Sequence, residues 1–178
     1  GSFEWVELYR PNIYLVYLPV ILRNATSSMA DTHWTAPLPS QSVSSTGQFD
    51  ISGWQITDED GNSYIIPEDL PEVPRDKYVV VVFDGHGSDE VDYDFSDGLA
   101  VLHTSSSLVS VFEDEADQVA LYSSSSHNPD TIVDFVAWGE PPGDDVANAV
   151  AAMLWPEEGY VGTAAAPGAL GLHLGGSL

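Results

Sequence analysis

Residues 13–22 form an almost unbroken apolar run, IYLVYLPVIL, which limits the folds open to this chain. The run is too short to span a bilayer and contains Pro19, so a transmembrane helix is excluded. Full burial of such side chains is worth about 2 kcal/mol each, so the folded protein must cover them. We expect the run to form an edge strand, where Pro19 is tolerated without a backbone donor.

The composition is that of a folded, strongly acidic protein. Of 178 residues, 43% are hydrophobic and 11% aromatic, which excludes a disordered chain. Four Lys and Arg against 28 Asp and Glu give a formal net charge of −24, which excludes nucleic acid and anionic membranes as partners. A halophilic origin would produce the same excess of acidic over basic residues. The chain has no Cys, so disulfides and thiol chemistry are excluded.

Short segments rich in β-branched and aromatic residues predict a mostly β fold. Asp60 and Gly61 separate two of these segments and supply the positive φ of a hairpin turn. The segment 77–83 is the strongest strand, and we expect it to be buried on both faces. A two-sheet sandwich is the default architecture for this pattern. Strands are expected at residues 3–10, 53–57, 63–66, 77–83, 109–112, 118–122 and 131–139.

One helix is expected near residues 144–155. Asp144 or Asp145 is suited to its N-cap, the following residues are rich in Ala, and Pro156 stops it. Apolar residues nearly encircle this segment, so we expect the helix to pack against the protein.

Several phrases resemble the lamin tail domain family, in the order in which that family carries them. EWVELYRP opens the chain and DISGW follows after an interruption. PEVPRDKYVV resembles the family's "proline, then GxYLVV" strand, with Asp76 in place of Gly. DQVALY and VDFVAWG resemble two later strands. The resemblance covers residues 3–10 and 50–139.

The resemblance implies an immunoglobulin-like β-sandwich without catalytic activity, found in nuclear lamins and in many secreted bacterial proteins. The family places a further strand ahead of Trp5, which this sequence lacks. Residues 17–24, YLPVILRN, are similar to segments of secreted proteins from filamentous green bacteria. The expected organisation is one domain over residues 1–178, with an apolar strand and Ser/Thr-rich loop inserted at 11–49 and a helix plus Gly-rich tail at 140–178.

We expect the apolar run to replace the missing strand, and two arrangements are open. The run either pairs with its own sheet or completes the sheet of a second copy by strand addition. Addition to a second copy makes other copies of the same chain the partner and propagates into a filament or layer. The residues of this expected assembly strand are Ile13, Tyr14, Leu15, Val16, Tyr17, Leu18, Val20, Ile21 and Leu22.

The sequence predicts no catalytic residues, since its histidines are scattered without a metal or nucleophile motif. Calcium is the one cofactor that the sequence suggests, because alternating acidic residues on an extended segment offer oxygen ligands. A solvated acidic loop is the alternative for this segment. Asn24 begins an N-x-T glycosylation sequon. The expected calcium ligands are Asp89, Asp92, Asp94 and Asp97.

These observations predict an extracellular or cell-surface structural subunit that assembles with itself, without membrane insertion. One alternative is an accessory domain of a larger secreted protein that binds carbohydrate or peptide through Trp34 and Trp155. A calcium-dependent adhesin is the other.

Overall fold

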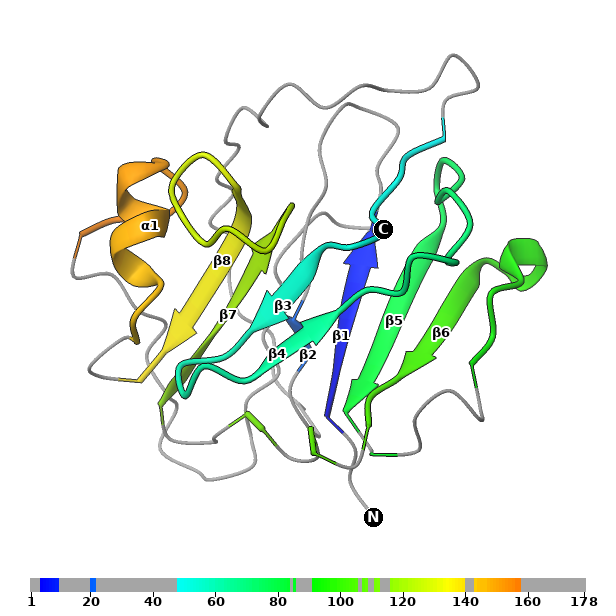
Figure 1. Ribbon diagram of the computed structural model, residues 1–178, viewed down its shortest axis with the longest axis horizontal. Helices are drawn as coiled ribbons and strands as arrows, with labels where there is room; N and C mark the ends of the chain where they lie inside the picture. Colours follow the sequence, from blue (N-terminus) through cyan, green and yellow to red (C-terminus); the bar gives the residue numbers. More distant parts are fainter. Residues whose placement is uncertain are drawn as a thin grey trace, which may run out of the picture.

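The computed structural model is mostly β, with two four-stranded sheets and one short helix in the part of the chain that it describes (Figure 1). It describes the backbone of residues 4–9 and 20–21, and both backbone and side chains of 48–83, 85, 91–105, 107–108, 111–112, 116–139 and 143–157. The mostly β class expected from the sequence is therefore confirmed.

The first sheet, called the mixed sheet below, has the order β2-β1-β5-β6. β1 (Glu4–Tyr9) runs antiparallel to both β2 (Val20–Ile21) and β5 (Tyr78–Phe83). β6 (Leu99–His103) is parallel to β5, and the connection between the two contains the 3-10 turn η2 (Phe95–Asp97).

The second sheet has the order β4-β3-β7-β8 and is antiparallel throughout. β3 (Gln55–Thr57) and β4 (Ser63–Ile65) form the expected hairpin, and Gly61 in its turn has a φ of +79°. β7 (Asp117–Tyr122) pairs with β3 on one side and with β8 (Ile132–Trp138) on the other.

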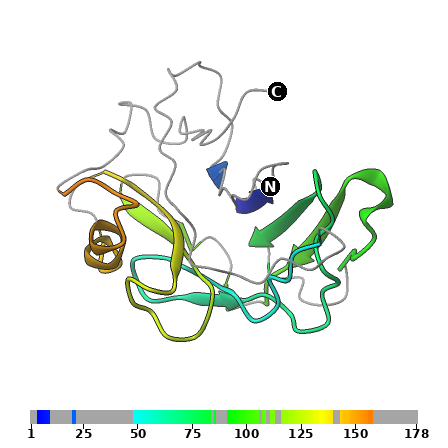
Figure 2. The ribbon, with the colours of Figure 1, turned by 90° about the horizontal axis from the view of Figure 1, so that it is seen from above.

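The two sheets share one hydrophobic core. Seen from above, β5 and β6 stand on the opposite side of the molecule from β7 and β8 (Figure 2). Apolar residues from both sheets belong to a single buried cluster, which is what two sheets that bury one face each require. Its members within strands are Ile56, Val79, Val81, Phe83, Ala100, Leu102, Val119, Leu121, Val133, Val136 and Trp138.

α1 (Val146–Ala151) packs on the outer face of the antiparallel sheet, beside β8 (Figures 1 and 2). The residues of β7 and β8 that point away from the main core form a second cluster with Ala149 of the helix. The expected helix is confirmed, although it ends before Pro156. Within the described residues, no helix has the length and apolar character needed to cross a membrane.

Three details differ from the sequence-based expectations. β6 was not predicted; its pairing with β5 is parallel and depends on a crossover rather than on a hairpin. The expected strand 109–112 does not form in its described half, residues 111–112, although Phe112 is a core residue whose ring lies 4.8 Å from that of Phe83. β5 alternates buried and half-buried residues, so only its core-facing side is fully covered.

Candidate functional site

One edge of the mixed sheet is the short strand β2. β2 pairs with β1 through Trp5↔Ile21 and Val6↔Val20. Continuing this antiparallel register would place Pro19 opposite Glu7. Proline has no backbone N–H to give to a ladder, and Pro19 itself lies outside the described residues.

β1 lies between β2 and β5 in the mixed sheet. It pairs with β5 over its whole length, from Glu4↔Phe83 to Tyr9↔Tyr78. On the side of β2, among the residues whose backbone is described, pairing is limited to Trp5 and Val6.

The structure places two residues of the expected assembly strand. Val20 and Ile21 pair with β1 of their own chain, the first of the two arrangements that the sequence leaves open. Pairing between copies stays a prediction. Asn24 and the other residues of the run lie outside the described part of the chain: Ile13, Tyr14, Leu15, Val16, Tyr17, Leu18 and Leu22.

The expected calcium ligands border β6. Asp92 forms an isolated bridge with Val101, with N–O distances of 2.8 and 2.7 Å. The carboxylates of Asp92, Asp94 and Asp97 accept hydrogen bonds from the backbone N–H two residues ahead, at 2.8, 2.9 and 3.3 Å. Hydrogen bonds from Ser96 lower the pKa of Asp94. The acidic side chains therefore stabilise turns.

A metal site is not assembled in the part of the chain that the structure describes. No group of three or more His, Asp or Glu side chains within it is arranged to hold an ion. Asp89 lies outside the described residues. Calcium binding by the acidic segment stays a prediction.

A polar cluster holds α1 against the antiparallel sheet, and we call it the α1 clamp. Its centre is the Asp145 carboxylate, which accepts hydrogen bonds from Tyr122 Oη at 2.6 Å and Thr57 Oγ1 at 2.8 Å. Gln118 Nε2 donates to the same carboxylate at 3.1 Å, and Gln118 Oε1 accepts from Asp145 N at 3.2 Å. Asn148 of α1 donates to Tyr122 Oη at 2.9 Å. The clamp thus joins two strands to the helix.

Burial sets the electrostatics of the clamp and its surroundings. Burial raises the pKa of Tyr122, and the hydrogen bond to Asp145 raises it further, so the phenol stays neutral and acts as a donor. Burial also raises the pKa of Asp58, against the hydrogen bonds that its carboxylate accepts from Asn62. The Asp58 carbonyl accepts a bond from Gln118, which connects the β3–β4 turn to the clamp.

The segment leading into α1 passes very close to this turn. A Cβ added to Gly143 would lie 2.6 Å from Glu59 Cβ and 2.9 Å from Gln118 Cδ. Contacts this short do not occur for real side chains, so the approach requires glycine. The sequence signal for this contact is a single Gly after two prolines, which by itself indicates only a turn.

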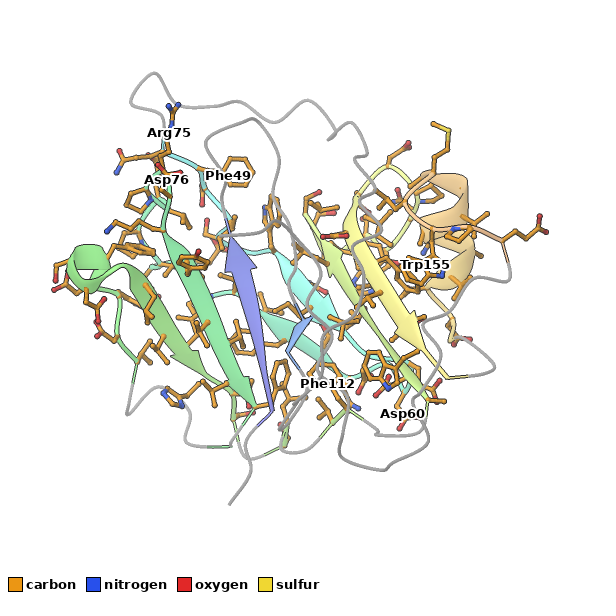
Figure 3. The ribbon with its side chains drawn as sticks, turned by 180° about the vertical axis from the view of Figure 1, so that it is seen from behind. Phe49, Asp60, Arg75, Asp76, Phe112 and Trp155 are labelled. Atoms are coloured by element: carbon orange, nitrogen blue, oxygen red, sulfur yellow. The ribbon has the colours of Figure 1, made fainter. Side chains whose placement is uncertain are left out.

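The aromatic residues near the clamp are engaged in packing. Trp155, offered by the sequence as a ligand-binding residue, is half-buried, and its ring lies 5.3 Å from Phe135 in an edge-to-face contact (Figure 3). Exposed His127 stacks on Tyr122 with ring centroids 4.3 Å apart, and its Nε2 lies 2.8 Å from Gln55 Oε1. Trp34 lies outside the described residues.

Sequence reasoning did not anticipate the clamp. Asp144 or Asp145 was expected to cap the helix; Asp145 is the N-cap residue, but its side chain makes no capping bond and binds the sheet instead. The available signal was that Gln118 and Tyr122 lie on the same face of one strand, a pattern typical of a solvent-exposed face. Here α1 covers that face.

Comparisons of this chain with protein-family models, with curated proteins and with solved structures gave no match. The resemblance carried by the sequence phrases therefore remains a prediction.

Proposed function

We propose that this protein is an extracellular structural subunit that assembles with copies of itself through the apolar run 13–22. In this proposal the fold is an immunoglobulin-like sandwich of the lamin tail type, and the protein performs no catalysis. Assembly produces a filament or a layer at the cell surface.

The arrangement of the sheets supports the sandwich. Two sheets that share one buried cluster are what a β-sandwich requires, although the parallel pair β5–β6 is a departure from a purely antiparallel one. Asp76 gives local support, because it stands where the resembling phrase has Gly and its φ is +60°. Gly, Asn and Asp are the residues that tolerate this left-handed conformation.

The observation that carries the proposal is the position of β2. The apolar run contributes the edge strand of the mixed sheet, directly beside Trp5, where the resemblance calls for an additional strand. A strand at the edge of a sheet is a position where main-chain pairing with another molecule can be added.

Charge explains why assembly would depend on such a strand. Copies with a net charge of −24 repel one another, so association requires a large apolar contribution. Residues 13–22 hold the longest apolar run in the chain and are suited to supply it. The packing of Trp155 against Phe135 weighs against the alternative of a ligand-binding module built on that residue.

The double substitution Leu18→Asp with Val20→Asp tests this function. We expect the parent protein to elute as polymer and to form fibres or sheets in negative-stain microscopy, and the variant to be a folded monomer. Circular dichroism melting checks that the monomer is folded. A parent protein that stays monomeric up to its solubility limit contradicts the proposal, as does a variant that assembles like the parent.

A matched control adds the same charge elsewhere. Ile65 and Met153 are the exposed large apolar residues in the described part of the chain, at 55% and 68% exposure. Ile65→Asp with Met153→Asp also adds two negative charges but leaves the apolar run intact. We expect this control to assemble, so loss of assembly in both variants would attribute the effect to charge alone.

A further inference from the structure

The chain contains three Asp-Gly pairs, at residues 60–61, 84–85 and 97–98. In such a pair the backbone nitrogen of the glycine can attack the side-chain carboxyl carbon of the aspartate, because glycine has no side chain to hinder the approach. In a folded protein the reaction depends on how firmly both groups are held. The structure describes both residues of the first and third pairs, whereas Asp84 lies outside the described residues.

The pair Asp60–Gly61 lies at the exposed tip of the β3–β4 hairpin (Figure 3). The base of this turn is closed, because the Asp58 N–H donates to the Asn62 carbonyl at 3.2 Å and the Asp58 carboxylate accepts from the Asn62 N–H at 2.7 Å. At the tip, no hydrogen bond within the described residues holds the Asp60 carboxylate or the Gly61 N–H. A Cβ built on Gly61 would meet no described atom within 4 Å, so the tip has room to rotate.

The pair Asp97–Gly98 is held at both reacting groups. The Asp97 carboxylate accepts the Leu99 N–H at 3.3 Å, and the Gly98 N–H donates to the Phe95 carbonyl at 3.2 Å. Each of these hydrogen bonds must break before the glycine nitrogen can reach the carboxyl carbon. The same two residue types are therefore held differently at two places in one molecule.

We propose that Asp60 is a site of spontaneous isoaspartate formation in the folded protein. The Gly61 nitrogen loses its proton and bonds to Asp60 Cγ, while the protonated carboxyl loses its hydroxyl. The proton and the hydroxyl leave as water, and a five-membered succinimide ring closes.

Hydrolysis of the ring completes the modification. Water adds to the backbone carbonyl carbon of Asp60 and breaks its bond to the Gly61 nitrogen. The main chain then runs through Cγ, and Asp60 carries a free α-carboxylate. One water is lost and one is gained, so the mass is unchanged, and nothing is oxidised or reduced.

Incubation of the folded parent protein for several weeks, near neutral pH and at body temperature, tests the proposal. Peptide mass spectrometry locates the product, since an endoprotease that cleaves before aspartate does not cut before isoaspartate. A transient species lighter by one water marks the succinimide. We expect isoaspartate at residue 60 to form about tenfold faster than at residue 97, where two hydrogen bonds must break first.

The same incubation in concentrated guanidinium chloride separates the fold from the local sequence. Unfolding removes the hydrogen bonds at Asp97–Gly98, so we expect residues 60 and 97 to react at similar rates. A difference that is as large in the unfolded chain as in the folded one would arise from the flanking residues, and it would overturn the assignment to the structure.

Two matched substitutions complete the test. Asp60→Glu keeps the charge but requires a less favourable six-membered ring, so we expect the signal at residue 60 to disappear while the melting midpoint stays that of the parent. Asp97→Glu should leave the rate at residue 60 unchanged. Absence of isoaspartate at residue 60 of the folded parent, or equal rates at residues 60 and 97, overturns the proposal.

Discussion

At the residue scale, the positions with unusual backbone geometry are the most informative. Asp76 and Met153 are the described non-glycine residues with positive φ, at +60° and +61°. Met153 follows α1 at the position where helices commonly place glycine. Its N–H donates to the Val150 carbonyl at 3.0 Å, and the Leu154 N–H donates to the Ala149 carbonyl at 2.8 Å. These two bonds make a Schellman motif, which closes the helix after Ala151, ahead of Pro156.

Met153→Gly should stabilise the protein. Glycine adopts the left-handed conformation without the strain of a side chain, and this gain exceeds its larger entropy loss on folding. Met153 is 68% exposed, so little buried apolar surface is lost. We expect a gain of about 0.5–1 kcal/mol in the free energy of unfolding, measured by urea denaturation.

The neighbouring substitution Ala152→Gly is the control for this prediction. Ala152 has a φ of −77°, where glycine has no advantage. We expect it to lose about 0.5–1 kcal/mol. A loss of stability in both variants would show that the φ at Met153 stores no strain.

At the scale of elements, α1 is attached by two different interactions. Its apolar side rests on the outer face of β7 and β8, and the α1 clamp fixes its first turn to β3 and β7. A helix this short is unstable in isolation, so both interactions are needed to keep it folded. The clamp also explains why polar Gln118 and Thr57 are almost fully buried.

Tyr122→Phe should weaken the clamp at neutral pH and alter the response to alkali. Loss of the bond to the Asp145 carboxylate should cost about 1–3 kcal/mol in the free energy of unfolding. Hydrogen exchange should become faster in α1. The folded-state pKa of Tyr122 is raised, so its contribution is complete below about pH 10, the unfolded value, and is lost as pH rises through the folded value. Above pH 10, the stability of the variant should therefore fall less steeply than that of the parent.

Tyr64→Phe separates the loss of the clamp from the change in stability at alkaline pH. Burial raises the pKa of Tyr64 as well, with a further contribution from Tyr93, but Tyr64 lies outside the clamp. In this control, we expect the free energy of unfolding to fall less steeply above pH 10 than in the parent, with no change of hydrogen exchange in α1. If stability falls above pH 10 as steeply in both variants as in the parent, the pKa values of Tyr122 and Tyr64 are not raised in the folded protein.

At the scale of the whole molecule, acidic residues greatly outnumber basic ones. Arg75 lies near one end of the structure, far from Asp60 at the opposite end (Figure 3). Asp58 and Glu59 precede Asp60 in the chain, and the Glu59 backbone N–H donates to the Asp117 carboxylate at 3.2 Å. Such a concentration of like charge opposes compaction.

Salt should therefore stabilise the fold. Raising NaCl from about 0.01 M to about 1 M shortens the screening length from about 30 Å to about 3 Å. Relief of about 2 kcal/mol of self-repulsion would raise the melting midpoint by about 4–8 °C, measured by scanning calorimetry. A variant with four fewer exposed charges should show a smaller rise, and an equal rise would contradict the repulsion argument. Its substitutions are Asp60→Asn, Glu72→Gln, Asp130→Asn and Asp144→Asn.

The sequence by itself determined the local elements. Alternating and continuous apolar patterns located β3, β4, β5, β7 and β8 to within a few residues. Gly61 marked the hairpin turn, and the Ala-rich segment marked α1. These features depend on residues that are neighbours in the chain, so their physical cause is visible in short windows of sequence.

The tertiary structure decided the pairings between distant segments. β6 is a strand because β5 lies parallel to it, and its short apolar pattern alone did not distinguish it from a loop. Asp145 turns away from a capping role because three donors on the sheet meet its carboxylate once α1 docks. β2 pairs with β1 of its own chain, whereas the sequence equally allowed pairing with another copy. Each outcome depends on contacts between residues far apart in sequence, whose energies no local pattern encodes.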